Sequence, residues 1–299
     1  MEKELDALIL NFDSESLGLV NVIIALVMFG VSLDIRIDDF KKLLTAPKPM
    51  IIGIISQFFL VPLTTYFLIL ALTPIPSIAL GMIMVASCPG GNISNFISKL
   101  AEGNTALSVS LTAFSTLLSV IMTPVNLSLW GGLYEPTALI LKSVHLDLFE
   151  ILKIVSMIMG LPLILGMLLR YFRSDLSDKL SYYLKPFSII IFIVFVIGAL
   201  YNNIGVFLNH IHYVFFLVLL HNLILYIVGF YFGKMTGLGF KDQKTLSIET
   251  GIQNSGLGLM LVFTFFNGLG GMALLVDFWG VWDMFSGLLV AYLWLKVKK

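Results

Sequence analysis

Nine apolar stretches, each long enough to cross a membrane, follow one another along this chain of 299 residues. A helix needs about 20 consecutive apolar residues to span the hydrocarbon core of a bilayer. The stretches are 17–33, 48–72, 76–99, 104–129, 147–170, 183–202, 211–233, 243–267 and 270–295. The chain is therefore predicted to be an all-α integral membrane protein with nine transmembrane helices.

Composition supports a membrane protein. Hydrophobic residues make up 58% of the chain and charged residues 12%, whereas a soluble domain carries about 25% charged residues. Residues 1–16 are polar and acidic and lack the basic start of a cleaved signal peptide, so we expect a short exposed tail. Residues 17–299 are predicted to form one polytopic domain. The single cysteine, Cys88, excludes an intrachain disulfide framework, and a net charge of zero gives no indication of a nucleic-acid partner.

Basic residues are distributed unequally between the two sides that nine spans define. One side receives 15 of the 18 lysines and arginines, and the other receives only Lys3, Lys142 and Lys153. Cytoplasmic loops of membrane proteins carry an excess of Lys and Arg. The sequence therefore predicts a multi-pass protein of the cell (inner) membrane, with the N-terminus outside and the C-terminus in the cytoplasm.

Two spans are interrupted by residues that disfavour a helix. Span 76–99 contains Cys88-Pro-Gly-Gly-Asn-Ile-Ser-Asn95, and span 243–267 contains Ser247-Ile-Glu-Thr-Gly-Ile-Gln-Asn-Ser-Gly256. Their positions predict two repeats of opposite orientation, about 17–130 and 147–299, with span 147–170 lacking a counterpart. Paired broken helices indicate the midplane site of a secondary transporter. The alternative is that Gly and Pro are simply common in membrane helices, but polar side chains cluster at both interruptions.

Glu249 lies inside the second interruption and needs a counter-charge. A carboxylate in hydrocarbon costs several kcal/mol, and no Lys or Arg lies within the apolar core of a span. Lys153 comes nearest, close to a span end where its ammonium can reach the interface. The counter-charge is therefore expected to be an external cation or a proton.

Oxygen-bearing side chains accompany Glu249 on other spans. Ser108 and Thr112 are four residues apart and share one helix face. Alternatives stay open: these hydroxyls could bond carbonyls of their own preceding turn, and Gln57 could serve as a link between helices. The other candidates are Ser94 and Asn95 in the first interruption and Gln253 and Asn254 in the second.

Sodium suits this set of side chains better than zinc or copper. The four histidines are scattered and form no Cys/His cluster, whereas hard cations prefer carboxylate, amide, hydroxyl and carbonyl oxygens. A proton remains the alternative, although a proton needs no shell of hydroxyls.

The sequence contains no evident nucleophile–base pair, so we do not expect an enzyme. Asp283, deep in the last span, is a lower-ranked candidate for facing the cavity.

Three separated segments together resemble the bile acid:sodium symporter family. They are Cys88-Pro-Gly-Gly-Asn-Ile-Ser-Asn95, Gly103-Asn-Thr-Ala-Leu-Ser-Val-Ser-Leu-Thr112 and Glu249-Thr-Gly-Ile-Gln-Asn254. The resemblance covers nearly the whole chain. It implies an inverted-repeat transporter with a core domain and a panel domain, in which two broken helices cross beside two sodium sites. Bacterial members commonly show ten spans, whereas this chain resembles the nine-span version.

The resemblance also implies which residues hold the ions. One sodium site would comprise Ser94, Asn95, Ser108, Thr112 and Glu249. The other would comprise Gln57, Glu249 and Gln253, with the backbone carbonyls of Thr250 and Ile252. Glu249 would thus contact both coupling ions, and no organic cofactor is expected.

We therefore predict a sodium-coupled symporter that imports an organic anion by alternating access. The family's substrates include bile acid-like, pantoate-like and keto-acid anions. Asn92, Ile93 and Asn254, at the two interruptions, are the candidates for contact with the anion, and the transporter is predicted to act as a monomer. The alternatives are a proton-coupled transporter of the same fold and a passive channel or sensor.

Overall fold

The computed structural model describes residues 14–33, 35, 47–144, 148–184, 186–187, 190 and 204–296. In these ranges the only extended pairing is one isolated bridge between Gly90 and Gln253, and the rest of the regular structure is helical. The helices are α2 (Ser14–Ser32), α4 (Pro47–Ile55), η1 (Ser56–Leu60), α5 (Val61–Leu72), α6 (Pro76–Ser87), α7 (Ile93–Leu100), α8 (Thr105–Leu133), α9 (Glu135–Ser143), α10 (Leu148–Val155), η2 (Ser156–Gly160), α11 (Leu161–Phe172), α13 (Ile204–Met235), α14 (Phe240–Gly251), α15 (Ser255–Phe266) and α16 (Gly270–Lys296).

The described helices cover the predicted spans to within several residues, but α9 (Glu135–Ser143) lies outside every predicted span. Four are long and apolar enough to cross a membrane: Pro47–Leu72, Thr105–Leu133, Leu208–Met235 and Gly270–Lys296. Spans 76–99 and 243–267 are each divided into two helices, α6 with α7 and α14 with α15. Most of span 183–202 lies outside the described residues. The protein is an all-α membrane protein in the described ranges, and nine spans remain a prediction for the whole chain.

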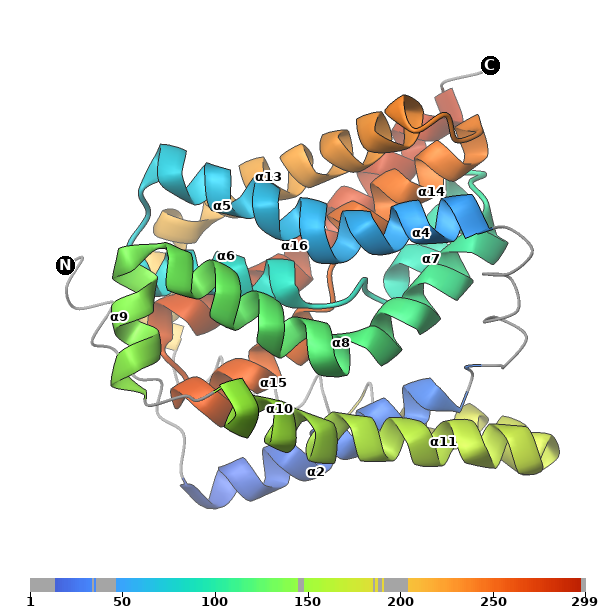
Figure 1. Cartoon of the computed structure of the whole chain (residues 1–299), viewed down its shortest axis with the longest axis horizontal. Helices are drawn as coiled ribbons and strands as arrows, with labels where there is room; N and C mark the ends of the chain where they lie inside the picture. The colour runs from blue at the N-terminus through green and yellow to red at the C-terminus, as the bar shows by residue number, and fades with distance from the viewer. Residues whose placement is uncertain are drawn as a thin grey trace.

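Two groups of helices lie side by side. Helices α2, α10 and α11 run along one side of the molecule, at the bottom of Figure 1, and α2 packs against α11. On the other side, α4, α5, α6, α8, α13, α14 and α16 pack together. The first group contacts the second through α15 and α8. We call the first group the α2–α11 layer.

Close packing inside the α2–α11 layer depends on Gly166. A Cβ placed there would overlap the Oγ of Ser32 on α2. The Ser32 hydroxyl donates to the Phe29 carbonyl at 2.7 Å and approaches the Pro162 carbonyl at 3.4 Å. Small residues allow membrane helices to approach closely, so α2 and α11 form one tightly packed pair.

The centre of the molecular core is built from two short apolar helices, α6 and α15. In α6 and α15, nearly every side chain is buried, as expected for helices that are hydrophobic on all sides. The core side chains include Met82, Met84, Phe263 and Trp279, the last on α16. The interrupted helices therefore lie deep inside the protein.

A π-helical turn interrupts the α4–α5 helix at η1, before Pro62. Proline lacks the N–H that would bond the carbonyl four residues earlier. That carbonyl, on Phe58, instead accepts a hydrogen bond from Asn126 Nδ2 of α8 at 3.0 Å. π-Helical turns occur often at functional sites, and this one carries Gln57, a predicted ion ligand.

Candidate functional site

The two helix interruptions lie against each other. The Gly91 N–H donates to the Ile252 carbonyl at 3.1 Å, and the Asn254 N–H donates to the Pro89 carbonyl at 2.9 Å. With the Gly90–Gln253 bridge, these bonds make a short antiparallel pairing between segments more than 150 residues apart. Irregular backbone at membrane depth survives only when it is buried or lines a cavity. Here each interruption supplies hydrogen-bond partners for backbone N–H and C=O groups of the other.

Side chains from neighbouring helices bind the remaining carbonyls at the end of α6. Thr123 Oγ1 on α8 donates to the Ser87 carbonyl at 2.7 Å. Gln57 Nε2 on η1 donates to the Cys88 carbonyl at 2.8 Å. Helix ends leave carbonyls without intrahelical partners, so these two bonds stabilise the end of α6 inside the membrane.

Glu249 is buried on α14, with 4% of its surface exposed, and it faces the hydroxyls predicted from the sequence. Its Oε1 accepts from Ser94 Oγ at 2.5 Å and also from Ser108 Oγ. Thr112 Oγ1 lies 3.3 Å from Oε1 and 3.1 Å from Oε2. Asn95 joins this group because its Oδ1 accepts from Ser108 at 2.9 Å and from Thr112 at 3.2 Å. All five predicted members of the first site are therefore together.

This cluster contains more oxygen acceptors than protons. Ser94, Ser108 and Thr112 each supply a single hydroxyl proton. Ser108 and Thr112 each lie within hydrogen-bond distance of both Asn95 Oδ1 and Glu249, and one proton serves only one acceptor fully. The cluster thus combines six side-chain oxygens and one negative charge with only three hydroxyl protons, and oxygens of this kind are the ligands that hard cations prefer.

The second predicted set of ligands adjoins the first. Gln57 Nε2 donates to Gln253 Oε1 at 2.6 Å, and Gln253 Nε2 donates to the Thr250 carbonyl at 2.8 Å. The Ile252 carbonyl accepts from Gly91. Gln57, Thr250, Ile252 and Gln253 thus meet at the end of α14, next to Glu249.

Gly90 lies between these two sets. A Cβ at this residue would be 2.9 Å from Glu249 Oε2 and 3.9 Å from Gln57 Oε1. Side-chain oxygens from both predicted sites therefore face the same backbone position, where a methyl group would occupy the space. The residues present fit a small cation held by oxygen ligands. Among the described residues, no group of three or more His, Cys, Asp or Glu side chains is placed to hold a metal ion.

Lys244, which the predicted topology counts among the cytoplasmic basic residues at the end of span 243–267, is nevertheless buried. This side chain, on α14, is only 5% exposed. Its ammonium donates to the Ala101 carbonyl at 2.9 Å and to the Trp294 carbonyl at 3.4 Å, and it lies 5.1 Å from the centre of the Phe240 ring. Its charge is therefore directed to helix ends and aromatic faces, and no described Lys or Arg forms an ion pair with Glu249.

A cavity of about 540 Å³ lies between α2 and the two interruptions. One wall is apolar, with Val27, Met28 and Val31 of α2. The opposite wall includes all three predicted substrate contacts, Asn92, Ile93 and Asn254, and also ion-site members. The polar lining comprises Asn92, Asn95, Thr112, Thr116, Gln253, Asn254 and Ser255. The described lining carries no charged side chain.

Asn254 has a fixed orientation at this cavity. Its Oδ1 accepts from the Leu257 N–H at 3.0 Å and so caps the start of α15. Asn is among the preferred residues at this position. With its oxygen committed to the cap, the side chain offers its NH₂ donors as the group available to a ligand. Ser255, Gly256 and Leu257 of the first turn also line the cavity.

Comparison with known proteins identifies the family of this chain. The model of the sodium bile acid symporter family matches residues 21–210, well over half of the chain. The chain belongs to the sodium bile acid symporter family. The resemblance inferred from the three motifs is thereby confirmed, and the protein is a multi-pass membrane protein of a sodium-dependent transporter family.

Individual relatives extend beyond bacteria. The chain is 34% identical over 284 residues to the "Uncharacterized sodium-dependent transporter YocS" of Bacillus subtilis (strain 168), covering 94% of this chain and 84% of that protein. It is 30% identical to the "Probable sodium/metabolite cotransporter BASS1, chloroplastic" of Arabidopsis thaliana, over 80% of this chain and 57% of that protein. It is 27% identical to the "Ileal sodium/bile acid cotransporter" of Cricetulus griseus, over 82% of this chain and 72% of that protein.

The sequence reasoning missed Ser56 and misplaced Asp283. Ser56, on η1, lies within hydrogen-bond distance of the Thr250 hydroxyl at 2.8 Å, and its position next to Gln57 is the only sequence signal for it. Asp283 does not line the cavity as the sequence analysis suggested. It is buried behind the second interruption, where it accepts the Gln253 N–H at 3.0 Å.

Proposed function

We propose that this protein is a secondary active transporter that couples inward movement of sodium to import of an organic anion. The observation that carries the proposal is the excess of oxygen acceptors over protons around buried Glu249. Membership of a sodium-dependent family supports the identity of the ion. The specific anion and the transport cycle are part of the proposal.

Two ions are proposed. Ser94, Asn95, Ser108, Thr112 and Glu249 hold the first, and Gln57, Glu249, Gln253 and the carbonyls of Thr250 and Ile252 hold the second. Glu249 supplies its two carboxylate oxygens to different neighbours: Oε1 lies among the hydroxyls, whereas Oε2 also faces Gly90 and the second set. A single carboxylate shared by several neutral oxygens favours monovalent cations, because divalent cations usually recruit more negative ligands.

A sodium site explains this arrangement better than a proton carrier. Protonation of Glu249 would neutralise the charge and add one O–H donor, but a proton carrier does not need the surrounding oxygens of Ser94, Asn95, Ser108 and Thr112. A cation uses all of these oxygens as ligands. Proton coupling is the alternative to sodium coupling that the experiment below distinguishes.

The cavity suits an anion with an apolar body. Its polar wall includes the first turns of α7 and α15, and helix N-termini attract anions through free N–H groups and the helix dipole. Asn92 and Asn254 add side-chain amides, and the α2 wall is apolar. A carboxylate would therefore lie against the interruptions and an apolar moiety against α2. Bile acid-like, pantoate-like and keto-acid anions are the proposed classes.

Shared residues couple the ions to the anion. Asn95, Thr112 and Gln253 belong to the proposed ion sites and also line the cavity. Sodium binding would fix these side chains in the arrangement that the anion requires. A ligand shifts a conformational equilibrium only by its different affinity for the two states, and shared side chains provide such a difference.

Alternating access would move the α2–α11 layer, as the panel, against the interrupted helices of the core. The cavity lies at the boundary between them, so relative movement would open it to one side or the other. Two sodium ions with one monovalent anion carry net positive charge inward. The membrane potential would then assist import by about 2.3 kcal/mol per charge per 100 mV.

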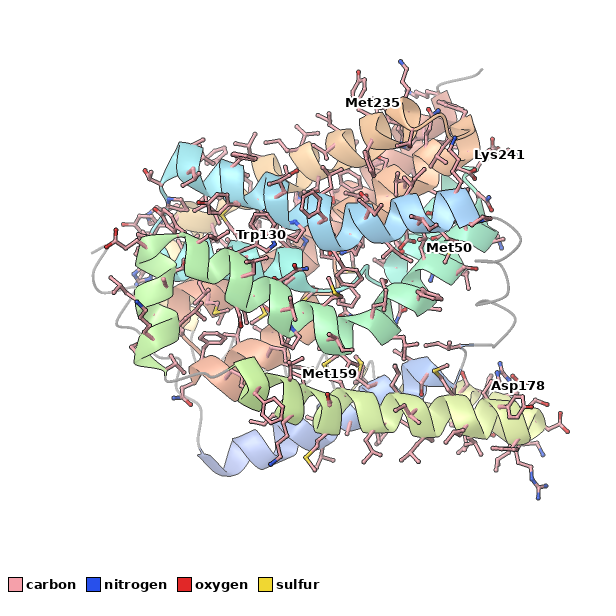
Figure 2. The ribbon with its side chains drawn as sticks, viewed as in Figure 1. Met50, Trp130, Met159, Asp178, Met235 and Lys241 are labelled. Atoms are coloured by element: carbon pink, nitrogen blue, oxygen red, sulfur yellow. The ribbon has the colours of Figure 1, made fainter. Side chains whose placement is uncertain are left out.

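In this proposal, the distribution of basic residues in the loops determines the orientation in the membrane. Lys241 and Asp178 lie at the end of the molecule where the C-terminus emerges (Figures 1 and 2). That end carries most of the basic residues in the predicted topology, so it is proposed to be cytoplasmic in the inner membrane, with the N-terminus outside. We propose a monomer as the functional unit.

A ligand-stability experiment tests the proposal. The purified protein is heated with taurocholate, pantoate or pyruvate, each in NaCl and in choline chloride at equal ionic strength. A substrate should raise the melting temperature only in NaCl, because ligands stabilise the state they bind. The same anion should then accumulate in proteoliposomes under an inward sodium gradient. Accumulation driven by an acid pulse without sodium would favour proton coupling, and equilibration without accumulation would favour a channel.

A further inference from the structure

A second buried carboxylate lies behind the α14–α15 interruption. Asp283, on α16, is only 3% exposed and is absent from the described cavity lining. Its Oδ2 accepts from the Gln253 N–H at 3.0 Å, and its Oδ1 accepts from Asn222 Nδ2 at 3.1 Å. No described Lys or Arg forms an ion pair with it. Burying a carboxylate at membrane depth costs free energy, so Asp283 is expected to have a specific role at this position.

The peptide between Ile252 and Gln253 is held from both sides. In a trans peptide the C=O and the N–H point in opposite directions in one plane. The Ile252 carbonyl points to the first interruption, where Gly91 donates to it at 3.1 Å. The Gln253 N–H points away, to Asp283. Without Asp283 this N–H would be a buried donor lacking a partner, which costs about 1–3 kcal/mol.

Asn222 on α13 fixes the other oxygen of Asp283. Its Nδ2 donates both to Asp283 Oδ1 at 3.1 Å and to the Gly251 carbonyl at 3.0 Å. Its Oδ1 accepts from Trp282 Nε1 at 3.2 Å. Because the indole only donates, it determines which end of the amide faces Asp283. Residues 251 and 253 are therefore held by two side chains from neighbouring helices.

We propose that Asp283 is a positioning residue for the second sodium site. It orients the Ile252–Gln253 peptide so that the Ile252 carbonyl and the Gln253 side chain face the ion, and it links α16 to sodium binding. This inference rests on the proposed function for the identity of the ion. The positioning itself is a property of the backbone and is measurable without sodium.

Two substitutions separate positioning from simple packing. Asp283→Asn and Asp283→Leu both remove the charge and are similar in size to the native side chain. Asn retains an oxygen that can accept the Gln253 N–H, whereas Leu has no acceptor. If Asp283 only filled space, Leu would be tolerated at least as well as Asn, because replacing a buried charge with an apolar group is often stabilising.

The first measurement is backbone hydrogen exchange in choline chloride. In Asp283→Leu, the peptide containing Gln253 should exchange at least tenfold faster than in the wild type, and in Asp283→Asn the increase should be smaller. Asp277→Asn and Asp277→Leu, on the same helix, are the matched controls and should leave this peptide unchanged. Unchanged exchange in Asp283→Leu would overturn the proposal, whether or not the protein responds to sodium.

The second measurement is the NaCl concentration that gives half of the sodium-dependent thermal stabilisation. We expect at least a tenfold increase for Asp283→Leu, a smaller increase for Asp283→Asn and none for the Asp277 variants. An Asp283→Leu variant with faster exchange but wild-type sodium dependence would overturn the link to the ion. A wild type that does not respond to NaCl would refute the proposed function, while the exchange data would still decide whether Asp283 positions the interruption.

Discussion

Ser94 donates a hydrogen bond to Glu249 at 2.5 Å, although 155 residues separate them along the chain. Ser94 lies in the first turn of α7, and Glu249 lies in the last turn of α14. The bond therefore joins the two interrupted helices at the level of their interruptions. Each predicted repeat supplies one part of the charged centre, and neither repeat could form it alone.

Replacing Glu249 with Gln should abolish the response to sodium. The amide keeps the size of the carboxylate but removes the negative charge that balances the cation. We expect the stabilisation by NaCl to disappear, with the melting temperature in choline chloride equal to or above that of the wild type, because an uncompensated buried charge is destabilising. Thermal unfolding in both salts measures this effect. Glu135→Gln, at an exposed residue of α9, should keep the full NaCl response, and a normal response in Glu249→Gln would exclude the carboxylate as an ion ligand.

Gly90→Ala should interfere with ion binding through a single methyl group. The new Cβ would lie 2.9 Å from Glu249 Oε2, closer than a carbon and an oxygen normally approach. We expect at least a tenfold higher NaCl concentration for half of the thermal stabilisation. Gly132→Ala is the matched control, since a Cβ there meets nothing within 4 Å. Alanine in a helix interior is more stable than glycine by about 0.5–1 kcal/mol, so this control should be neutral or stabilising. Equal sodium dependence in the two variants would contradict the position assigned to the ions.

Spacing along the sequence predicted part of the cluster around Glu249, and the family resemblance supplied the full set of ligands. Ser108 and Thr112 share a helix face in any regular helix, and the glycines and Pro89 mark the first interruption. The structure confirms that these side chains meet at Glu249. It shows their proximity, and their role as sodium ligands stays a proposal.

Other contacts depend on packing that a single sequence does not encode locally. Asp283 and Asn222 are far from Gln253 along the chain, and their contact results from how α13 and α16 pack on α14. Burial of Lys244 has a similar origin: the predicted topology counts it among the cytoplasmic basic residues, but near the start of α14 the ends of other helices surround it. The π-helical turn that places Ser56 beside Thr250 is signalled only indirectly, by Pro62.

Asn126→Leu should show that the π-helical turn supports the second ion site. Asn126 Nδ2 bonds the Phe58 carbonyl that Pro62 leaves free, and Phe58 follows Gln57 directly. Leaving this buried carbonyl unpaired should cost about 1–3 kcal/mol and weaken the placement of Gln57. We expect a lower melting temperature in choline chloride and a reduced affinity for sodium. Asn209→Leu, at an exposed residue of α13, makes the same change away from the site. Loss of stability without a change in sodium affinity would assign Asn126 a structural role alone.

Substitutions at Asn254 should separate recognition of the anion from formation of the site. Asn254 caps α15 with its oxygen and lines the cavity, which leaves its NH₂ group for the ligand. Asp and Ser also cap helices well, so Asn254→Asp and Asn254→Ser should fold and retain the NaCl response. Asp places a negative charge at the cavity, whereas Ser only removes the amide donors. Uptake of the anion that stabilises the wild type in sodium should therefore show a KM raised at least tenfold by Asp and raised less by Ser. If Asp transports that anion with a wild-type KM, the carboxylate of the substrate does not lie at the start of α15, and the α7 end of the cavity near Asn92 becomes the place to test next.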